Sequence, residues 1–265
     1  YATIEGEEGD AGNEYASGDK LGLNLPGLQE ELLETVTAVG KPVVLVISAG
    51  SALDLSWADA HVAAIIDSFY PGARGGKAVA EAIFGDFSPS GKLPVTFYQG
   101  TENLPEFTDY DNSHRTYRYT DKNVLYPFGY GLHYGTIRYE NAQISCAQCS
   151  VRDAVDVSVD VINESSYTIH ESVQAYIQHE EADAYEPGYQ LKGIQTVTLQ
   201  PKETKRVTIS LKVRDFAIIT QEGECVVRPG SYRGQQPDAR SAKLTGSDVA
   251  ELVVRREGVQ TPVEY

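Results

Sequence analysis

The sequence predicts a partial α/β sandwich with half of a mostly parallel sheet, followed by an all-β sandwich. Between residues 25 and 98, unbroken aliphatic runs alternate with amphipathic helical stretches and Gly-rich turns. From residue 138 onward, short strands of alternating polarity are separated by turns about every ten residues. The chain has 265 residues, of which 41% are hydrophobic, and this is enough for two domains with their own cores.

The first helix and the first strand follow each other closely. Pro26 and Gly27 precede a predicted helix over 28–39, whose apolar positions recur with a period of about 3.6 residues. Gly40 is expected to end this helix as a C-cap. The run 43–47 is aliphatic throughout, without alternation, which indicates a strand buried on both faces.

The same alternation continues to residue 98. A short helix is predicted over 56–62, and a second buried strand is predicted over 63–66 together with Phe69 and Tyr70. A Gly-rich turn at 71–76 leads into a helix over 77–84, and a third strand is predicted over 93–98. Three strands make only half of such a sheet, and an open edge is unfavourable. We therefore expect the other half from sequence that precedes this chain.

An aromatic-rich stretch, 97–134, separates the two patterns. Its Tyr and Phe residues are interleaved with Pro, Gly, Asp and Asn, which disfavour a helix or a long strand. Aromatic faces can stack on sugar rings, but packing of an irregular connection is the favoured interpretation for most of them.

The C-terminal part has the pattern of a β-sandwich. Alternation predicts half-buried strands over 155–161, 172–178, 193–199 and 206–211. Turns are predicted at 201–203 and 228–232, and the polar residues after about 256 are expected to be a loose tail.

Composition excludes several classes of partner. The net charge of −16 disfavours nucleic acid and anionic membranes, and it is compatible with a neutral substrate. Cys146 and Cys149 form a single C-x-x-C and Cys225 stands apart, so ordinary thiols are favoured over a metal or redox site. The five histidines have no ligand spacing, and no metal or other cofactor is implied.

The most suggestive stretch for chemistry is the acidic segment at 4–10. Glu5, Glu7, Glu8 and Asp10 lie close together and are separated by glycines, which indicates a loop rather than a helix face. Neighbouring carboxylates repel, and one that is also desolvated has a raised pKa, as a general acid requires. The alternative is a solvated acidic loop, which spacing alone favours.

Ordered motifs reveal a family resemblance. The sequence resembles the C-terminal part of family 3 glycoside hydrolases, including the fibronectin type III-like domain that ends them, at these segments in order: 4–8, 25–33, 40–46, 70–72, 83–86, 90–96, 126–132, 171–177, 191–193 and 229–232. The resemblance covers nearly the whole chain.

The resemblance implies a three-part retaining exo-β-glycosidase. A barrel-like first domain would supply an Asp nucleophile, a six-stranded α/β sandwich would supply a Glu acid/base, and the fibronectin-like domain would follow. Glu5 matches the acid/base by its position after Ile4, and Glu7 and Glu8 are the alternatives. Because no nucleophile has a counterpart here and the chain begins with Tyr1 and lacks Met, we expect a fragment that works with an N-terminal catalytic barrel segment or chain.

The implied domain boundaries follow from the same motifs. They are 1–105 for the C-terminal portion of the α/β sandwich with the acid/base loop, 106–137 for an aromatic-rich linker, 138–257 for the fibronectin type III-like domain and 258–265 for a tail.

Substrate choice is less sharply defined. Segments 104–110 and 115–119 resemble the β-xylosidase branch most, and β-glucosidases share much of them. The implied substrate is an oligosaccharide or aryl glycoside. Trp57 and Tyr110 are the candidates for lining the aglycone side, although core or linker packing is the more usual role of each.

Two other functional classes compete with this assignment. One is a non-catalytic carbohydrate- or partner-binding module built on the sandwich. The other is a separate subunit whose active site is completed by a partner chain. A homodimer of the full assembly and a cytoplasmic or secreted location are both left open.

Overall fold

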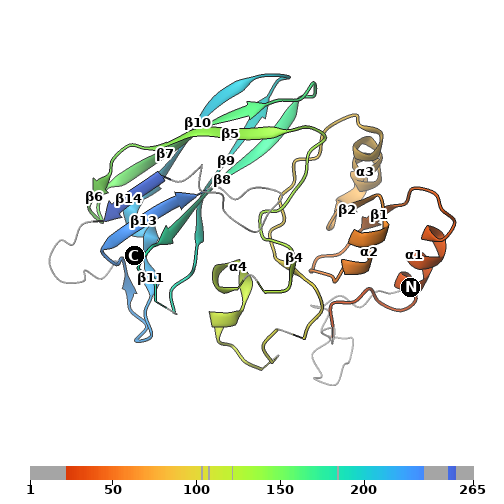
Figure 1. Ribbon diagram of the computed structural model, residues 1–265, viewed down its shortest axis with the longest axis horizontal. Coiled ribbons are helices and arrows are strands. Elements are labelled where there is room, and N and C mark those ends of the chain that lie inside the picture. Colours follow the sequence, from red (N-terminus) through yellow and green to blue (C-terminus); the bar gives the residue numbers. More distant parts are fainter. Residues whose placement is uncertain are drawn as a thin grey trace. The chain divides into compact units, whose positions relative to one another are not determined.

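The computed structural model describes residues 22–235 and 250–254, except 103, 107, 121 and 184. The chain forms two compact units (Figure 1). Apart from the segments outside the described residues, unit 1 consists of residues up to Asp86, Leu93–Thr108 and Asp121–Phe128, and unit 2 of Phe87–Lys92, Asp109–Thr120 and the chain from Gly129 onward. The predicted acidic loop and polar tail lie outside the described residues.

Unit 1 begins with the predicted helix and strand. Helix α1 spans Gln29–Thr37, and Gly40 follows it with a φ of 76°, a conformation that glycine adopts without strain. Strand β1 spans Val44–Ile47. The expectation that this strand is buried on both faces is wrong in this structure, because Val44 and Val46 are exposed while Ile47 is buried.

The remaining elements of unit 1 follow in the predicted order, with one change of topology. They are α2 (Ser56–His61), β2 (Ala64–Asp67), the 3₁₀ turn η1 (Gly72–Arg74), α3 (Gly75–Phe84), β3 (Phe97–Tyr98) and β4 (Val124–Tyr126). Strands β1 and β2 pair in parallel. The predicted strand over 93–98 shortens to β3, which pairs antiparallel with β4 instead of joining the parallel sheet.

One hydrophobic cluster holds unit 1 together. Its buried members are Leu33, Ile47, Ala49, Leu53, Leu55, Ala58 and Phe97. The cluster thus joins α1, the end of β1, the segment leading into α2, and β3. In strand β2, Ile65 packs against this cluster, but no residue of the strand is fully buried, so the second strand is less buried than predicted. The expectation that Phe69 and Tyr70 belong to this buried strand is wrong, because β2 ends at Asp67, Phe69 has a positive φ and Tyr70 is exposed.

Unit 2 is the predicted β-sandwich (Figure 1). Its strands are β5 (Ile137–Ile144), β6 (Gln148–Cys149), β7 (Ala154–Asn163), β8 (Ile169–His179), β9 (Gln190–Leu199), β10 (Thr204–Lys212), β11 (Ile218–Ile219), β12 (Cys225–Val226), β13 (Gly230–Gln235) and β14 (Ala250–Val254). One sheet has the order β10-β7-β5, and a second has the order β6-β14-β13-β8-β9. The short pair β11-β12 stands beside them, and three 3₁₀ or helical turns, η2 (Asn112–His114), α4 (Thr116–Tyr119) and η3 (Val213–Phe216), complete the unit.

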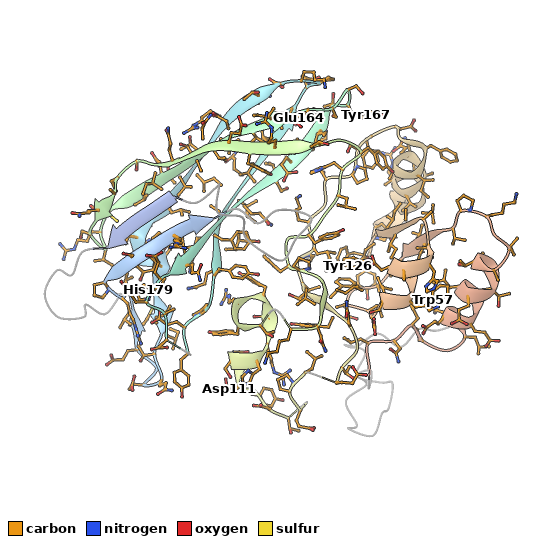
Figure 2. The ribbon with its side chains drawn as sticks, in the orientation of Figure 1. Trp57, Asp111, Tyr126, Glu164, Tyr167 and His179 are labelled. Carbon is orange, nitrogen blue, oxygen red and sulfur yellow. The ribbon has the colours of Figure 1, made fainter. Side chains whose placement is uncertain are left out.

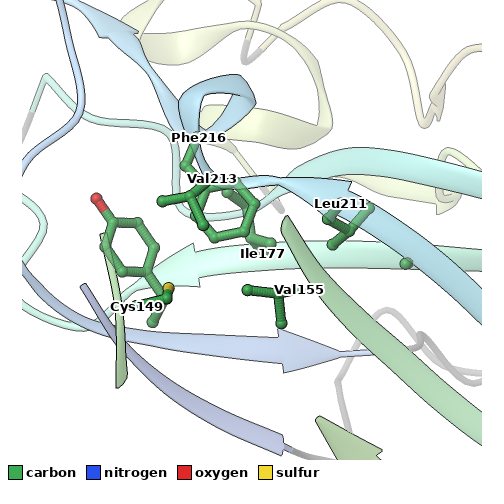
Figure 3. Packing of buried hydrophobic residues seen from close by; sticks show 8 residues of the cluster. Cys149, Val155, Ile177, Leu211, Val213 and Phe216 are labelled. Atoms are coloured by element: carbon green, nitrogen blue, oxygen red, sulfur yellow. The ribbon is translucent and has the colours of Figure 1, made fainter. Parts of the chain in front are cut away.

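Alternation along β7 places its valines in the sandwich core. Val155 and Val161 are fully buried, as the sequence pattern predicts. Two clusters fill the space: one contains Cys149, Val155, Ala175, Ile177, Leu211, Val213, Phe216 and Tyr232 (Figure 3), and the other Val159, Val161, Val173, Leu199 and Val207. Burial of this apolar area is the main stabilising contribution to the unit.

A buried polar cluster lies among the apolar side chains of unit 2. Glu171 is 2% exposed, and its carboxylate contacts His133 Nε2, accepts from the Tyr139 hydroxyl at 2.7 Å and lies 3.2 Å from Lys92 Nζ. Burial would raise the pKa of Glu171, but these three partners together hold it below its usual value. Lys92 also donates to the Gly131 carbonyl oxygen.

Several residues of the aromatic stretch pack as predicted. Tyr117, on α4, lies edge-on to Tyr176, with ring centroids 6.1 Å apart, and its hydroxyl accepts from the Leu191 N–H at 3.1 Å. In unit 1, Phe97 is buried and packs on Tyr126. These rings stabilise the irregular connection rather than forming an open platform.

Candidate active site

The acidic segment with the predicted acid/base lies just upstream of the described chain. Glu5, Glu7 and Glu8 all lie outside the described residues. Near the start of the described part, the Leu23 carbonyl oxygen accepts a hydrogen bond from the Asp54 N–H at 2.8 Å. Leu23, near the start of the described residues, is therefore held against the turn before α2.

Asp54 connects three separate parts of unit 1. Its Oδ1 accepts from the N–H of Ser56 at 3.0 Å and from the Ser56 hydroxyl at 2.5 Å, at the first residue of α2. Its Oδ2 accepts from the Gly100 N–H at 2.8 Å, just after β3. The side chain of Asp54 thus joins the start of α2 to the residue that follows Gln99 after β3, and its backbone N–H binds Leu23.

Two serines meet at the carboxyl ends of the parallel strands. Ser48 follows β1 and Ser68 follows β2, and their hydroxyl oxygens are 2.8 Å apart. Because the Ser68 hydroxyl donates to the Ile47 carbonyl oxygen at 2.7 Å, the Ser48 hydroxyl is the donor between the two serines. In open parallel α/β sheets, ligands bind at the carboxyl ends of the strands.

A close approach between the two strand ends requires glycine. A Cβ at Gly50 would lie 2.6 Å from the Tyr70 ring, so a larger residue would displace that side chain. Tyr70 itself is exposed. The turn before it is held by Asp67, whose Oδ1 accepts from the Phe69 N–H at 2.9 Å and stabilises the positive φ of 47° at Phe69.

The edge is therefore lined by hydroxyl and carboxylate groups. The hydroxyls of Ser48, Ser68 and Tyr70 can both donate and accept hydrogen bonds, which suits a neutral, hydroxyl-rich ligand. At these strand ends the hydroxyl oxygens of Ser48 and Ser68 are already hydrogen-bonded to each other. A ligand would therefore have to share these hydroxyl groups with that hydrogen bond.

Trp57 lies in α2 and is half-buried (Figure 2). Its ring stacks on His61 at a centroid distance of 4.3 Å, and it packs against the hydrophobic cluster of unit 1. His61 Nδ1 also lies 2.7 Å from the Trp57 carbonyl oxygen. These contacts fix the indole as part of the α2 packing.

Tyr110 belongs to unit 2 and is 86% exposed. It lies in a loop ordered by Asp109 and Asp111, each of which accepts a backbone N–H two residues further on. The ring is exposed to solvent, whereas the indole of Trp57 is packed within unit 1. A substrate role for either residue remains a prediction.

The described residues provide few groups for a metal. Within 22–235 and 250–254, apart from the four omitted positions, no three His, Cys, Asp or Glu side chains come close enough to hold an ion. No helix in the described part of the chain is long and apolar enough to cross a membrane.

Sequence reasoning did not single out Asp54, Ser48 or Ser68. The role of Asp54 could have been predicted locally, because an Asp side chain that accepts from the backbone N–H two residues later is typical of a turn leading into a helix. For the two serines, the sequence shows only that each one directly follows an aliphatic strand. Their meeting depends on the parallel pairing of β1 with β2.

The fold and this edge define the class of protein: an α/β unit with polar side chains at the carboxyl ends of parallel strands, followed in sequence by a fibronectin-like β-sandwich. Residues 2–134 match the glycosyl hydrolase family 3 C-terminal domain, and residues 171–234 match the fibronectin type III-like domain. The chain belongs to glycosyl hydrolase family 3.

Known relatives agree with this membership. The chain is 36% identical over 220 residues to a β-xylosidase of Formosa agariphila, covering 81% of this chain and 30% of the relative. It is 34% identical over 232 residues to a xylan 1,4-β-xylosidase of Xylanibacter ruminicola, covering 87% of this chain and 26% of that relative. The chain thus spans less than a third of the length of these relatives.

A solved structure gives the same result at the level of the fold. A β-glucosidase from Erythrobacter marinus superposes with a TM-score of 0.78 at 34% identity, covering 95% of this chain and 34% of that one.

Proposed function

We propose that this chain supplies the acid/base half of a retaining exo-β-glycosidase that releases a terminal non-reducing sugar. The observation on which this rests is the match of residues 2–134 to the family 3 C-terminal domain, because this match includes the acidic segment. Within it, Glu5 is the proposed acid/base, with Glu7 and Glu8 as alternatives.

The proposed reaction uses two carboxyl groups about 5 Å apart, the separation typical of retaining enzymes. Glu5 protonates the leaving glycosidic oxygen while an Asp of the N-terminal barrel attacks the anomeric carbon. Glu5, now ionised, takes a proton from the water that hydrolyses the glycosyl-enzyme. Glu7 and Glu8 would raise the pKa of Glu5 or hold sugar hydroxyls.

The barrel is proposed as the partner of this chain, as a segment of the same polypeptide or as a second chain. The greater length of the relatives supports this proposal. Exposed apolar side chains on α1 and β1 support it too, because such patches favour a covering polypeptide.

For the sugar, we propose β-D-xylose, with β-D-glucose as the second candidate. Two relatives are β-xylosidases, and this favours the first. The β-glucosidase fold match favours the second. Trapping the nucleophile of the full assembly with fluorinated xylosides and glucosides, followed by peptide mapping, would distinguish them: the sugar that labels the barrel Asp faster is the substrate sugar.

The acid/base assignment is tested by Glu5→Ala in the full assembly. We expect kcat/KM to fall roughly 10²–10⁴-fold on glycosides with poor leaving groups, because these need protonation. Activated aryl glycosides should lose far less, since their leaving groups depart without a proton. Glu7→Ala and Glu8→Ala are the matched controls, and an equal loss on both substrate types would contradict the assignment.

A further inference from the structure

The chain contains one Asn-x-Ser/Thr tripeptide, Asn163-Glu164-Ser165, and strand β7 ends at its first residue. This tripeptide is the acceptor sequence for N-linked glycosylation, and it normally marks a surface loop of a secreted protein. In this fold the acceptor side chain has the opposite environment, because Asn163 is 0% exposed. The amide that would carry a glycan therefore lies inside the sandwich.

The buried amide joins the end of β7 to the segments around β8 and β9. Its Nδ2 donates to the carbonyl oxygens of Tyr167 at 2.7 Å, Gln200 at 3.0 Å and Leu199 at 3.3 Å. Tyr167 precedes β8, and Leu199 is the last residue of β9. Glu164 and Tyr167, which are labelled in Figure 2, mark this end of the sandwich. Both hydrogens of the NH₂ group are thus used within the fold.

The third residue of the acceptor sequence is bound to the same side chain. Asn163 Oδ1 accepts from the Ser165 N–H at 2.9 Å and from the Ser165 hydroxyl at 2.6 Å. A Cβ at Gly135 would lie 2.3 Å from the Cβ of Ser165, so this serine also packs closely on the neighbouring backbone. The amide and the hydroxyl that define the acceptor sequence are therefore both engaged in the folded chain.

We propose that Asn163 accepts an N-linked oligosaccharide only in the unfolded chain, so that glycan transfer and folding of the sandwich exclude each other. The donor is a lipid-pyrophosphate-linked oligosaccharide of the secretory pathway. Asn163 Nδ2 forms a bond to the anomeric carbon of the donor, and the bond from that carbon to the pyrophosphate oxygen breaks. The amide loses one proton to a base of the transferase, and the lipid pyrophosphate leaves. This inference is independent of the proposed glycosidase reaction.

The exclusion acts in both directions. A glycan on Asn163 would replace one Nδ2 hydrogen by an oligosaccharide, for which a fully buried and close-packed position has no room. It would also deprive the carbonyl oxygens around the amide of a donor, which is unfavourable in a buried site. Conversely, once the sandwich has closed around the amide, a transferase cannot reach it. A glycan at this position therefore identifies a chain that was modified before it folded.

The test is to express the full chain behind a secretion signal in a eukaryotic host, with degradation of retained chains blocked by a proteasome inhibitor. Secreted and retained chains are digested, and occupancy at Asn163 is mapped by mass spectrometry after enzymatic release of glycans, which leaves Asp at an occupied position. We expect the retained wild type to carry the glycan and the secreted, folded wild type to lack it. Thermal melting followed by circular dichroism identifies the folded fraction.

Ser165→Ala isolates the effect of the glycan from that of the substitution. It removes the acceptor sequence and keeps Asn163 with its bonds to the three carbonyl oxygens. We expect a larger secreted fraction than for wild type in the eukaryotic host. In the cytoplasm of a bacterial host, where this transfer does not occur, the two chains should give similar soluble yields.

Lys202→Asn, made together with Ser165→Ala, supplies a matched exposed acceptor. It creates an Asn-Glu-Thr sequence at 202–204, in the turn whose Glu203 carbonyl oxygen accepts from the Asn163 N–H at 2.9 Å. Lys202 is exposed and has a φ of 62°, a conformation that asparagine tolerates. We expect this variant to be secreted and folded with a glycan at position 202.

Two results would overturn the proposal. One is a secreted, folded wild type that carries a glycan at Asn163, because folding and modification would then be compatible. The other is a retained wild type without a glycan at Asn163 in the host that modifies Lys202→Asn, because the unfolded chain would then not be an acceptor.

Discussion

Glu171 shows how a single buried charge is stabilised in this chain. Its carboxylate lies between Lys92, His133 and Tyr139, which come from segments 32 to 79 residues away in sequence. A buried charge without partners is costly, but one with several hydrogen bonds is held in its ionised form. The sequence shows an ordinary Glu in an alternating strand, so this role could not be predicted without knowing which segments pack together.

The lowered pKa of Glu171 makes part of the stability of unit 2 dependent on pH. Because the folded-state pKa lies below the unfolded value near 4.5, this stabilisation is complete above pH 4.5 and is lost as pH falls through the folded pKa. Glu171→Gln should unfold more easily at neutral pH by about 3–5 kcal/mol, since Lys92 and His133 lose their charged partner. Its stability should also vary less with pH below 4.5 than that of wild type.

Urea unfolding at several pH values would measure both effects. Glu164→Gln is the control, because Glu164 pairs with Arg138 at the surface and should contribute little. If Glu171→Gln kept the acid sensitivity of wild type, the pH dependence would come from other groups.

The other residue-scale prediction concerns catalysis. Glu5 could be singled out from the sequence because a motif surrounds it, whereas its neighbours Glu7 and Glu8 have the same chemistry and nearly the same position. Spacing cannot separate them. The order of the motifs favours Glu5, and the substitutions proposed above decide among the three.

At the scale of elements, most of the fold follows from local pattern. Helices α1, α2 and α3 lie within a few residues of their predicted positions, as do strands β7 to β10. The third strand of unit 1 is the main exception. Pro94 has no N–H to donate and interrupts the predicted strand, so only Phe97 and Tyr98 pair, and they pair with β4.

The start of α2 depends on Asp54, and this can be tested. Asp54→Ala removes acceptors for the Ser56 and Gly100 backbone N–H groups, and we expect unit 1 to lose about 1–3 kcal/mol of stability. Ser56→Ala removes only one side-chain hydrogen bond and should cost much less. The measurement is the unfolding free energy, together with hydrogen exchange at residues 22–25. Equal effects of the two substitutions would show that Asp54 does not organise this turn.

At the scale of the whole molecule, unit 1 has an apolar surface that its own elements do not cover. Leu32 and Val36 lie in α1, and Leu28 and Val39 flank its two ends; all four side chains are exposed, Leu28, Leu32 and Val39 to 76%, 63% and 71%. Their spacing of three and four residues places them on one side of the helix. The side chain of Leu33 points about 100° away from that of Leu32 and is buried in the cluster of unit 1. The sequence period predicted an amphipathic helix, but it could not show which apolar residues face the core of this unit.

This surface leads to a prediction about assembly. Because Leu32 is exposed in this chain, Leu32→Glu should leave the melting temperature of the chain nearly unchanged, while weakening its association with the proposed barrel at least tenfold, about 1.4 kcal/mol. Leu33→Ala, one residue away, should instead lower the unfolding free energy of the chain by about 2–5 kcal/mol, since Leu33 is buried. Thermal melts of the chain and titration against the barrel would measure the two effects separately. If Leu32→Glu bound the barrel as tightly as wild type, α1 would face solvent in the assembly. The proposed barrel would then have to contact another face of unit 1.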